Sequence, residues 1–210
     1  SALEIATNAI DCIHTTAASH GRVFIVEVMG HKVGWLTLHA GLAGGADIIL
    51  LPEIPYDINV VCDAITKRSK AGKRFSILAV AEGAISREEA SMSKKELKAK
   101  KRTEMVYPSV AYEIGARITE ITGSEVRVTV PGHMQRGGEP CAYDRVLSTR
   151  LGATAAKMIA DGEFGYMAAV KNNDIVKVPL SEVAGRLKTV DPNCSMIKEA
   201  KMVGICFGDE

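Results

Sequence analysis

One glycine-rich segment carries the residues best suited to bind an anion. Its sequence, Pro131-Gly132-His133-Met134-Gln135-Arg136-Gly137-Gly138, places a histidine and an arginine three residues apart between glycines. The glycines let the backbone approach a ligand closely, while the guanidinium fork of Arg136 and the imidazole of His133 reach the same negative group. A phosphate group fits this description.

Other polar residues stand directly after the apolar runs of the chain. Met29-Gly30-His31-Lys32 follows the run 23–28, Pro52-Glu53 follows the run 47–51, and Glu82-Gly83 follows the run 75–81. These runs alternate with helical stretches, a pattern typical of parallel strands joined by helices. Because ligands bind at the carboxyl ends of strands in open parallel sheets, we expect these residues and the glycine-rich segment to converge on one pocket.

Pattern alone leaves two interpretations open for Arg127 and for Glu82, and favours one for Glu27. Arg127 alternates with Val126 and Val128, so it is either a solvated side chain on a strand or a functional residue. Glu82 suits recognition of sugar hydroxyls, and it equally suits the cap of a helix. Glu27 lies inside an apolar strand, where a carboxylate must be paired or hydrogen-bonded, and we interpret it as one half of a structural ion pair.

Hydrophobic periodicity predicts the elements that position these residues. Helices are expected over residues 1–13, 33–43, 58–70, 109–122 and 144–160, strands over 23–28, 47–51, 75–81 and 126–130, and a hairpin over 166–178. Apolar strands of this kind are covered on both faces. The predicted fold class is therefore α/β, a three-layer, mostly parallel sheet with helices on both faces.

Composition excludes several classes of protein. The 210 residues hold 26 basic and 25 acidic side chains, a net charge of +1, which argues against nonspecific nucleic-acid binding. The 5 cysteines are scattered along the sequence, so we expect neither a disulfide framework nor a zinc ribbon. This pattern of cysteines favours a cytoplasmic location. The sequence has no apolar run near the roughly 18 residues of a membrane span and none of the common phosphate-loop or hydrolase motifs.

Several segments, in the same order along the chain, resemble the 6-phosphofructokinase family. They are Arg22–Gly30, Gly34–Leu36, Gly41–Asp47, Pro52-Glu53, Gly132–Pro140 and Tyr143–Arg145. The sequence Val33–Leu36 and an inserted basic stretch, residues 86–104, are most similar to the bacterial group that includes ATP-using and pyrophosphate-using enzymes. The resemblance runs from residue 1 to at least residue 173.

The resemblance implies phosphorylation of fructose 6-phosphate at its 1-hydroxyl, giving fructose 1,6-bisphosphate in glycolysis. Residues matching His133 and Arg136 hold the 6-phosphate in this family, and residues matching Arg22 and Arg127 reach in from a neighbouring subunit. Residues matching Met29, Gly30 and Glu82 hold the sugar. These roles imply a homo-oligomer with shared active sites, usually a homotetramer, and ATP or pyrophosphate as donor.

The chain departs from the family pattern in two ways. The family usually has arginine after Met-Gly, where this chain has His31 followed by Lys32, so either Lys32 supplies the charge on the transferring phosphoryl group or turnover is weakened. The amino-terminal segment of the family, with its donor loop, general base and Mg²⁺ ligand, is absent from these residues. We therefore expect the 210 residues alone to be inactive.

These expectations divide the chain into two parts. Residues 1–134 are predicted to form the fructose 6-phosphate-binding (acceptor) domain. Residues 135–210 are predicted to contribute to an incomplete donor-side domain, with exposed apolar helix faces, and to a C-terminal return. The alternative is a non-catalytic sugar-phosphate-binding or regulatory module, which His31 and the missing base would permit.

Overall fold

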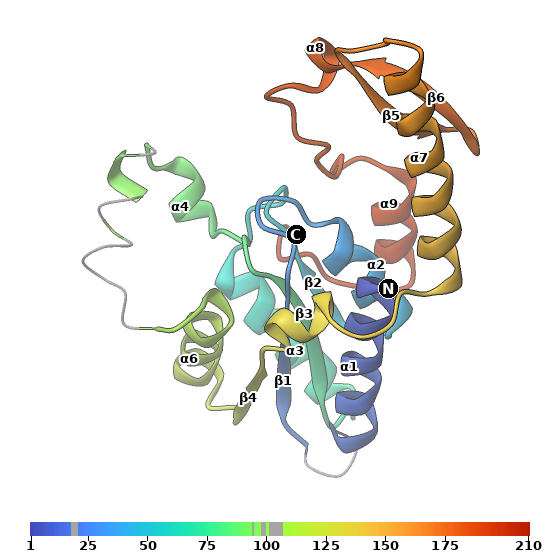
Figure 1. Cartoon of the computed structure of the whole chain (residues 1–210). Helices are drawn as coiled ribbons and strands as arrows, with labels where there is room; N and C mark the ends of the chain where they lie inside the picture. The colour runs from blue at the N-terminus through green and yellow to red at the C-terminus, as the bar shows by residue number, and fades with distance from the viewer. Residues whose placement is uncertain (18–20, 94, 98–99, 101–106) are drawn as a thin grey trace. The chain divides into compact units, whose positions relative to one another are not determined.

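A computed structural model describes residues 1–17, 21–93, 95–97, 100 and 107–210 (Figure 1). Its chain folds into two compact units, one of residues 2–137 and 189–210 and one of Ser1 and residues 138–188. Much of the basic stretch 86–104, including Lys94, Lys98, Lys101 and Arg102, lies outside the described residues. Within it, α4 (Arg87–Ser91) is preceded by its N-cap, Ser86. The side chains of Ser86 and Glu89 each accept a hydrogen bond from the backbone N–H of the other residue, which makes a capping box.

The larger unit is built on a parallel sheet of β1 (Val23–Val28), β2 (Ile48–Leu50), β3 (Ser76–Ala81) and β4 (Val126–Thr129). The strand order is β2-β3-β1-β4, and β1 pairs with both β3 and β4. All six residues of β1 and all six of β3 are buried, as their apolar sequences predict. The parallel sheet confirms the predicted fold class.

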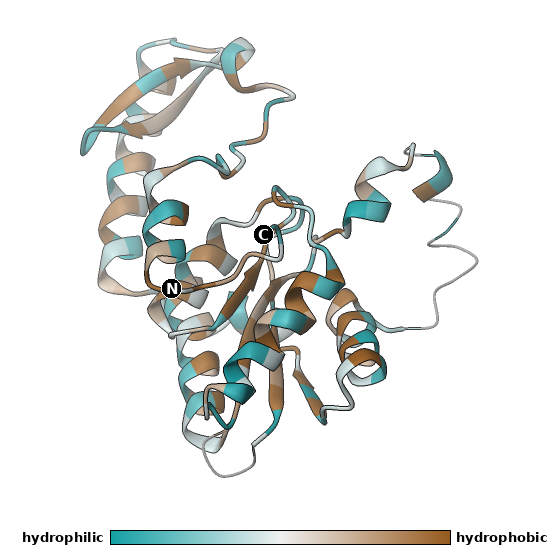
Figure 2. Ribbon diagram, turned by 180° about the vertical axis from the view of Figure 1, so that it is seen from behind, coloured by the Kyte–Doolittle hydropathy of each residue, from teal (hydrophilic) through white to brown (hydrophobic). Residues whose placement is uncertain are grey.

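Helices cover both faces of this sheet. Side chains of α1 (Ala2–Ala17), α2 (Trp35–Ala43) and α9 (Ser195–Met202) pack with Phe24, Val26 and Val28 of β1. Side chains of α3 (Ile58–Lys70) and α6 (Val110–Thr122) pack with Val23 and Ile25 on the opposite face. Successive side chains of β1 point to opposite faces of the sheet and so contribute to two hydrophobic cores. Figure 2 shows hydrophobic residues along the strands and on the helices beside them.

The smaller unit contains α7 (Ala142–Ala160), β5 (Tyr166–Lys171), β6 (Asp174–Pro179) and α8 (Leu180–Val183). Strands β5 and β6 form the expected antiparallel hairpin. Its turn residues Asn172 and Asn173 have φ of 49° and 69°, a conformation that asparagine tolerates. On α7, Val146 and Ile159 remain 60% and 65% exposed, as expected of an apolar helix face without a partner.

The division into units differs from the predicted boundary. The larger unit continues through Gly137, and residues 189–210 also belong to it, whereas the sequence placed residues 135–210 together. The physical reason is a long-range contact: Cys206 forms a parallel bridge with Ile48. In this bridge the carbonyl of Cys206 accepts from the N–H of Ile49 at 2.9 Å, and its N–H donates to the carbonyl of Asp47 at 3.1 Å. The acceptor and donor roles of the two parts stay a prediction.

Gly208 allows a stability prediction for this C-terminal segment. Its φ is +75°, and an added Cβ would lie 2.8 Å from the Cβ of Tyr56. A left-handed conformation costs a residue with a Cβ about 1–2 kcal/mol, and overpacking adds about 1–3 kcal/mol. We expect Gly208→Ala to lower the free energy of unfolding by both amounts, measured by denaturant unfolding.

Gly123 provides the matched control for this measurement. It ends α6 at a φ of +68°, and an added Cβ would meet nothing within 4 Å. Gly123→Ala should therefore show the backbone cost alone. Equal losses in the two variants would contradict the close packing around Gly208.

Candidate functional site

The carboxyl ends of β1 and β3 bring five of the predicted site residues together: Met29, Gly30, His31, Lys32 and Glu82. The register pairs Val28 with Ala81, so Met29 and Glu82 leave the sheet side by side. The Oε1 atom of Glu82 accepts hydrogen bonds from the backbone N–H groups of Gly30, at 3.1 Å, and His31, at 2.5 Å. The pattern left open whether Glu82 caps a helix. In the structure it instead holds the loop that carries His31 and Lys32.

This loop is a tight turn over residues 30–34. The N–H of Val33 donates to the carbonyl of Gly30 at 3.1 Å, and His31 has a φ of 56°, in the left-handed region. Gly83 lies against the turn, because a Cβ there would be 2.2 Å from the carbonyl oxygen of His31. The side chains of His31 and Lys32 are exposed. The backbone is therefore tightly held while both side chains are free to meet a ligand.

The glycine-rich segment forms a short 3₁₀ helix, η1 (Gly132–Arg136). Residues three apart in a 3₁₀ helix stand on the same side, so His133 and Arg136 project together, as their spacing predicts. Both side chains are exposed. An exposed imidazole and guanidinium on one side of a glycine-flanked helix can bind a phosphate between them.

Gln135 links two parts of the candidate site, and the sequence analysis did not identify it. It is 1% exposed, its Oε1 accepts from the N–H of Met29 at 3.2 Å, and its Nε2 donates to the carbonyl of Gly132 at 3.2 Å. It therefore fastens η1 to the end of β1 and joins the His133 and Arg136 pair to the Glu82 cluster. Its position between two exposed basic residues of a 3₁₀ helix was the available signal.

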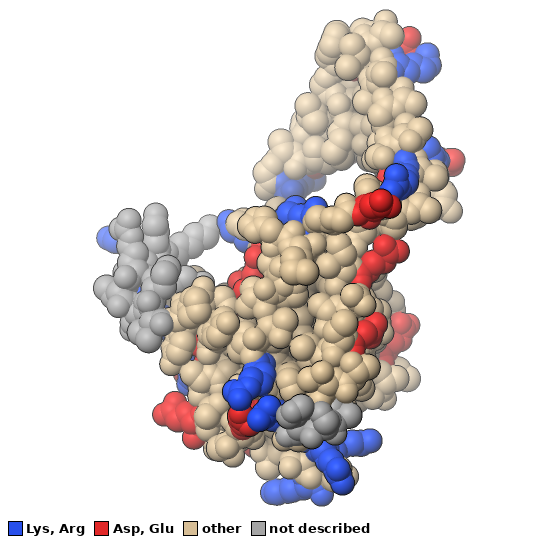
Figure 3. All heavy atoms as spheres, turned by 60° about the horizontal axis from the view of Figure 1, so that its bottom comes forward, with Lys and Arg blue, Asp and Glu red and all other residues tan. Residues whose placement is uncertain are grey.

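Arg22 and Arg127 lie at the other edge of the sheet. Arg22 precedes β1, and Arg127 pairs in register with Phe24 near the start of β1. Both guanidinium groups form ion pairs with Glu125. Figure 3, which brings the bottom of Figure 1 forward, shows basic and acidic side chains gathered at this end. At about 3.3 Å per residue, the length of β1 separates these arginines from Met29, so one chain does not bring all the predicted phosphate ligands together.

Glu27 differs from its predicted role. Its Oε2 accepts a hydrogen bond of 3.0 Å from the backbone N–H of Ala111, in the first turn of α6. Among the described residues it forms no ion pair. A backbone donor at the positive end of the helix macrodipole stabilises this buried carboxylate there.

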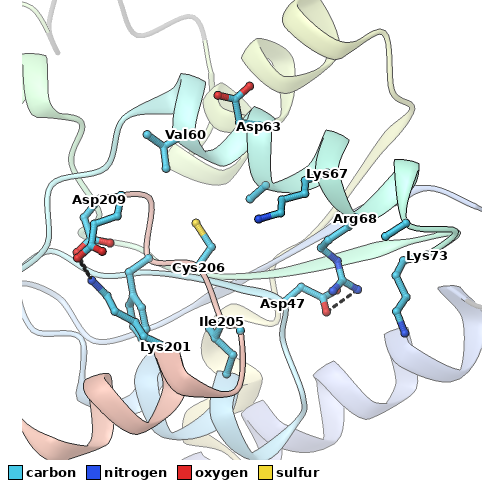
Figure 4. Close-up of a pocket in the computed structure, with 15 residues that line it drawn as sticks. Asp47, Val60, Asp63, Lys67, Arg68, Lys73, Lys201, Ile205, Cys206 and Asp209 are labelled. Carbon is cyan, nitrogen blue, oxygen red and sulfur yellow. Dashed lines mark hydrogen bonds and ion pairs between the residues drawn. The ribbon is translucent and has the colours of Figure 1, made fainter.

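A cavity of about 600 Å³ lies elsewhere, between α3 and the C-terminal segment (Figure 4). No predicted site residue lines it. Its wall contains three ion pairs: Asp47 with Arg68 at 2.7 Å, and Lys201 with both Asp209, at 2.7 Å, and Glu210, at 2.8 Å. Burial raises the pKa of both the Asp47 carboxyl and the Cys206 thiol in this wall. The cavity and the predicted sugar-phosphate residues are therefore separate features.

The described residues were also searched for metal sites and membrane spans. They contain no group of three or more His, Cys, Asp or Glu side chains arranged to hold a metal ion. We therefore assign no Mg²⁺ ligand to the described residues. Every described helix is too short or too polar to traverse a bilayer.

Sequence comparison finds relatives over the whole chain. Residues 1–159 match the family described as Phosphofructokinase. An ATP-dependent 6-phosphofructokinase of Spirochaeta thermophila is 53% identical over 100% of this chain and 57% of its own length. A pyrophosphate–fructose 6-phosphate 1-phosphotransferase of Streptomyces coelicolor is 46% identical over 99% of this chain and 58% of its own. The chain thus spans a little over half the length of these curated relatives.

Solved structures give the same result for the fold. A pyrophosphate-dependent phosphofructokinase from Nitrosospira multiformis superposes with a TM-score of 0.73 over 100% of this chain and 55% of its own, at 19% identity. A phosphofructokinase from Saccharomyces cerevisiae superposes with a TM-score of 0.70 at 34% identity, over 87% of this chain and 23% of its own.

Proposed function

The chain belongs to the phosphofructokinase family, and on that premise we propose that its protein phosphorylates fructose 6-phosphate at the 1-hydroxyl, with ATP or pyrophosphate as donor. The products are fructose 1,6-bisphosphate and ADP or phosphate. In this reaction the sugar 1-hydroxyl gives up its proton and its oxygen forms a bond to phosphorus, while the bond between phosphorus and the leaving oxygen of the donor breaks. This chain carries the acceptor half of the site, and the protein works in glycolysis in the cytoplasm.

One observation carries this proposal: the link that Gln135 makes between η1 and the end of β1. Because of it, the anion-binding pair His133 and Arg136 stands beside Met29, Gly30 and Glu82. A sugar phosphate needs such a pairing of cations at one end with hydroxyl acceptors along the other. The Oε2 atom of Glu82 receives neither of the backbone hydrogen bonds that Oε1 accepts, so it is the oxygen proposed to accept one from a sugar hydroxyl.

His31 and Lys32 are proposed to face the transferring phosphoryl group. Lysine presents a compact ammonium group on a flexible four-carbon side chain, which can reach a phosphoryl oxygen. Lys32 is therefore the residue proposed to stabilise the charge that develops on the phosphoryl oxygens. We assign neither the general base nor the donor ligands to residues of this chain, and no step is derived through Mg²⁺.

A second copy of the chain is proposed to complete the phosphate site. Arg22 and Arg127 lie at the opposite edge of the sheet from Arg136, so they can reach that phosphate only from a neighbouring subunit. In the free chain Glu125 pairs with both arginines, which holds the two guanidinium groups close together. The proposed assembly is a homo-oligomer with shared sites, and the family implies a homotetramer.

A non-catalytic sugar-phosphate-binding module is the second candidate. The observation in its favour is His31, which stands where the family usually has arginine. Such a module would still bind the sugar phosphate through His133 and Arg136, but it would not transfer a phosphoryl group to it.

The decisive assay uses the full-length protein with fructose 6-phosphate, Mg²⁺ and either ATP or pyrophosphate. Fructose 1,6-bisphosphate formed with one donor is the expected result. Binding of fructose 6-phosphate without product from either donor would establish the module instead. Absence of both binding and product would overturn the two proposals together.

A further inference from the structure

Glu53 has no role in the proposed reaction, yet its carboxylate joins three segments of the larger unit. The residue follows β2, and its side chain is partly buried. The N–H of Gly34 donates to both of its oxygens, at 3.0 and 3.1 Å. The N–H of Val190 donates to Oε1 as well, at 3.0 Å. Hydrogen bonds to a carboxylate are stronger than those to a neutral acceptor. Glu53 therefore holds the backbones of Gly34 and Val190 strongly in place.

The contact with Gly34 fixes one end of the turn that carries His31 and Lys32. Glu82 holds the other end through Gly30 and His31. Glu53 and Glu82 follow β2 and β3, which are neighbours in the sheet. Two carboxylates on adjacent strand ends therefore clamp the turn from both sides. We call residues 30–34 with Glu53 and Glu82 the carboxylate clamp.

The fit around Gly34 leaves little room for the turn to move. Gly34 is buried, and a Cβ there would lie 2.8 Å from Oε2 of Glu53 and 2.7 Å from the side chain of Leu51. Gly34 also precedes the first residue of α2, so its N–H is one of the donors that a helix leaves without an internal partner. Glu53 satisfies this donor and thereby sets where the turn ends and α2 begins.

The contact with Val190 extends the junction to the returning chain. Val190 is 1% exposed and lies two residues after Lys188, where the chain leaves the smaller unit and re-enters the larger one. Oε1 of Glu53 thus accepts hydrogen bonds from both Gly34 in the turn and Val190, the first buried residue after the chain re-enters the larger unit. A displacement of Val190 would therefore disturb the same oxygen atom that binds Gly34.

We propose that Glu53 is a positioning residue that holds the turn presenting His31 and Lys32 to the phosphoryl group, and that it ties this turn to the return of the chain at Val190. The inference rests on the proposed function for the chemistry of the turn. The sugar phosphate is proposed to meet His133 and Arg136, which Gln135 rather than Glu53 holds in place. Its sugar is proposed to meet Gly30 and Glu82, at the end of the turn that Glu53 does not contact. Loss of Glu53 should therefore lower kcat and leave the KM for fructose 6-phosphate nearly unchanged.

The test compares Glu53→Ala and Glu53→Gln in the full-length protein. A displacement of about 1 Å at a reacting group can lower a rate about 100-fold, so we expect kcat of Glu53→Ala to fall by about 10-fold to 100-fold. Glutamine keeps one oxygen acceptor, so Glu53→Gln should recover most of the loss. The control is Glu88→Ala, because the side chain of Glu88 is 70% exposed on α4 and should leave kcat unchanged.

Amide hydrogen exchange gives a second readout that does not depend on activity. Exchange at Gly34 and Val190 should accelerate in Glu53→Ala, while the buried amides of β1 keep their protection. Unchanged kcat, or exchange that accelerates equally in β1, would overturn the inference. If Glu53→Ala does not fold, hydrogen exchange in Glu53→Gln decides: the amides of Gly34 and Val190 should still exchange faster than in the wild type, and unchanged exchange at both would overturn the inference.

The two proposals can fail separately. A wild-type protein that makes no fructose 1,6-bisphosphate would end the proposed function, while accelerated exchange confined to Gly34 and Val190 would still establish the carboxylate clamp. An active wild type whose Glu53→Ala variant keeps full kcat would end the role of Glu53 alone.

Discussion

Gly83→Ala in the full-length protein is expected to lower kcat for phosphorylation of fructose 6-phosphate by about 100-fold. An added Cβ would lie 2.2 Å from the carbonyl oxygen of His31, and backbone atoms cannot move aside as a flexible side chain can. The turn that carries His31 and Lys32 must therefore shift. A shift of about 1 Å at groups that face the phosphoryl group accounts for a loss of this size.

Stability measurements separate this effect from unfolding. Overpacking at Gly83 should cost about 1–3 kcal/mol, which leaves most proteins folded. Gly152→Ala is the matched control, because Gly152 lies inside α7 and an added Cβ would meet nothing within 4 Å. We expect that control to keep full activity and to gain about 0.5–1 kcal/mol of stability. A folded Gly83→Ala variant with normal kcat would show that the turn does not serve the reaction.

Arg136→Ala is expected to raise the KM for fructose 6-phosphate by about 10-fold to 150-fold. Hydrogen bonds to charged groups contribute about 1.5–3 kcal/mol, and every 1.4 kcal/mol is tenfold in affinity. Arg136→Lys should fall between wild type and alanine, because lysine keeps the charge and loses the bidentate geometry. Substrate titrations of initial rate, with direct binding of fructose 6-phosphate, measure the effect.

Arg186→Ala serves as the control for the loss of one positive charge. Arg186 is exposed in the smaller unit and carries no proposed role, so its variant should keep the wild-type KM. Equal KM values for Arg136→Ala and wild type would place the sugar phosphate elsewhere.

Arg136→Ala, combined with Arg127→Ala, also tests whether two subunits share the phosphate site. The two substitutions lie at opposite edges of the sheet. An oligomer made only of one variant therefore lacks one of the two arginines at every phosphate site. Subunits of the two variants, dissociated and reassembled together, should regain activity, because some sites then receive Arg136 from one chain and Arg127 from another. Mixtures no more active than the separate variants would contradict the shared site.

Local pattern was sufficient for most of the larger unit. The strands β1 and β3 and the helix α3 begin and end within one residue of their predicted limits, because their signals are apolar runs or helical periodicity within a short segment. The same applies to His133 and Arg136, whose common side follows from their spacing. Asn172 and Asn173 predicted the turn of the hairpin correctly, because asparagine is one of the few residues that tolerate a positive φ.

The contacts that assemble the candidate site join residues far apart in the chain. Gln135 meets Met29, Glu53 meets Gly34 and Val190, and Glu27 meets Ala111. Hydrophobic periodicity does not predict such hydrogen-bond partners, because any donor that the fold brings near a buried polar group can satisfy it.

Sequence alone therefore determined the elements, the parallel sheet and the edge at which polar residues gather. Only the tertiary structure decided that Arg22 and Arg127 lie at the opposite edge, that residues 189–210 return to the larger unit and that two carboxylates clamp the turn at His31. The reason is physical: secondary structure reflects the preferences of neighbouring residues, whereas a site depends on which strand ends the packing of the whole sheet makes adjacent.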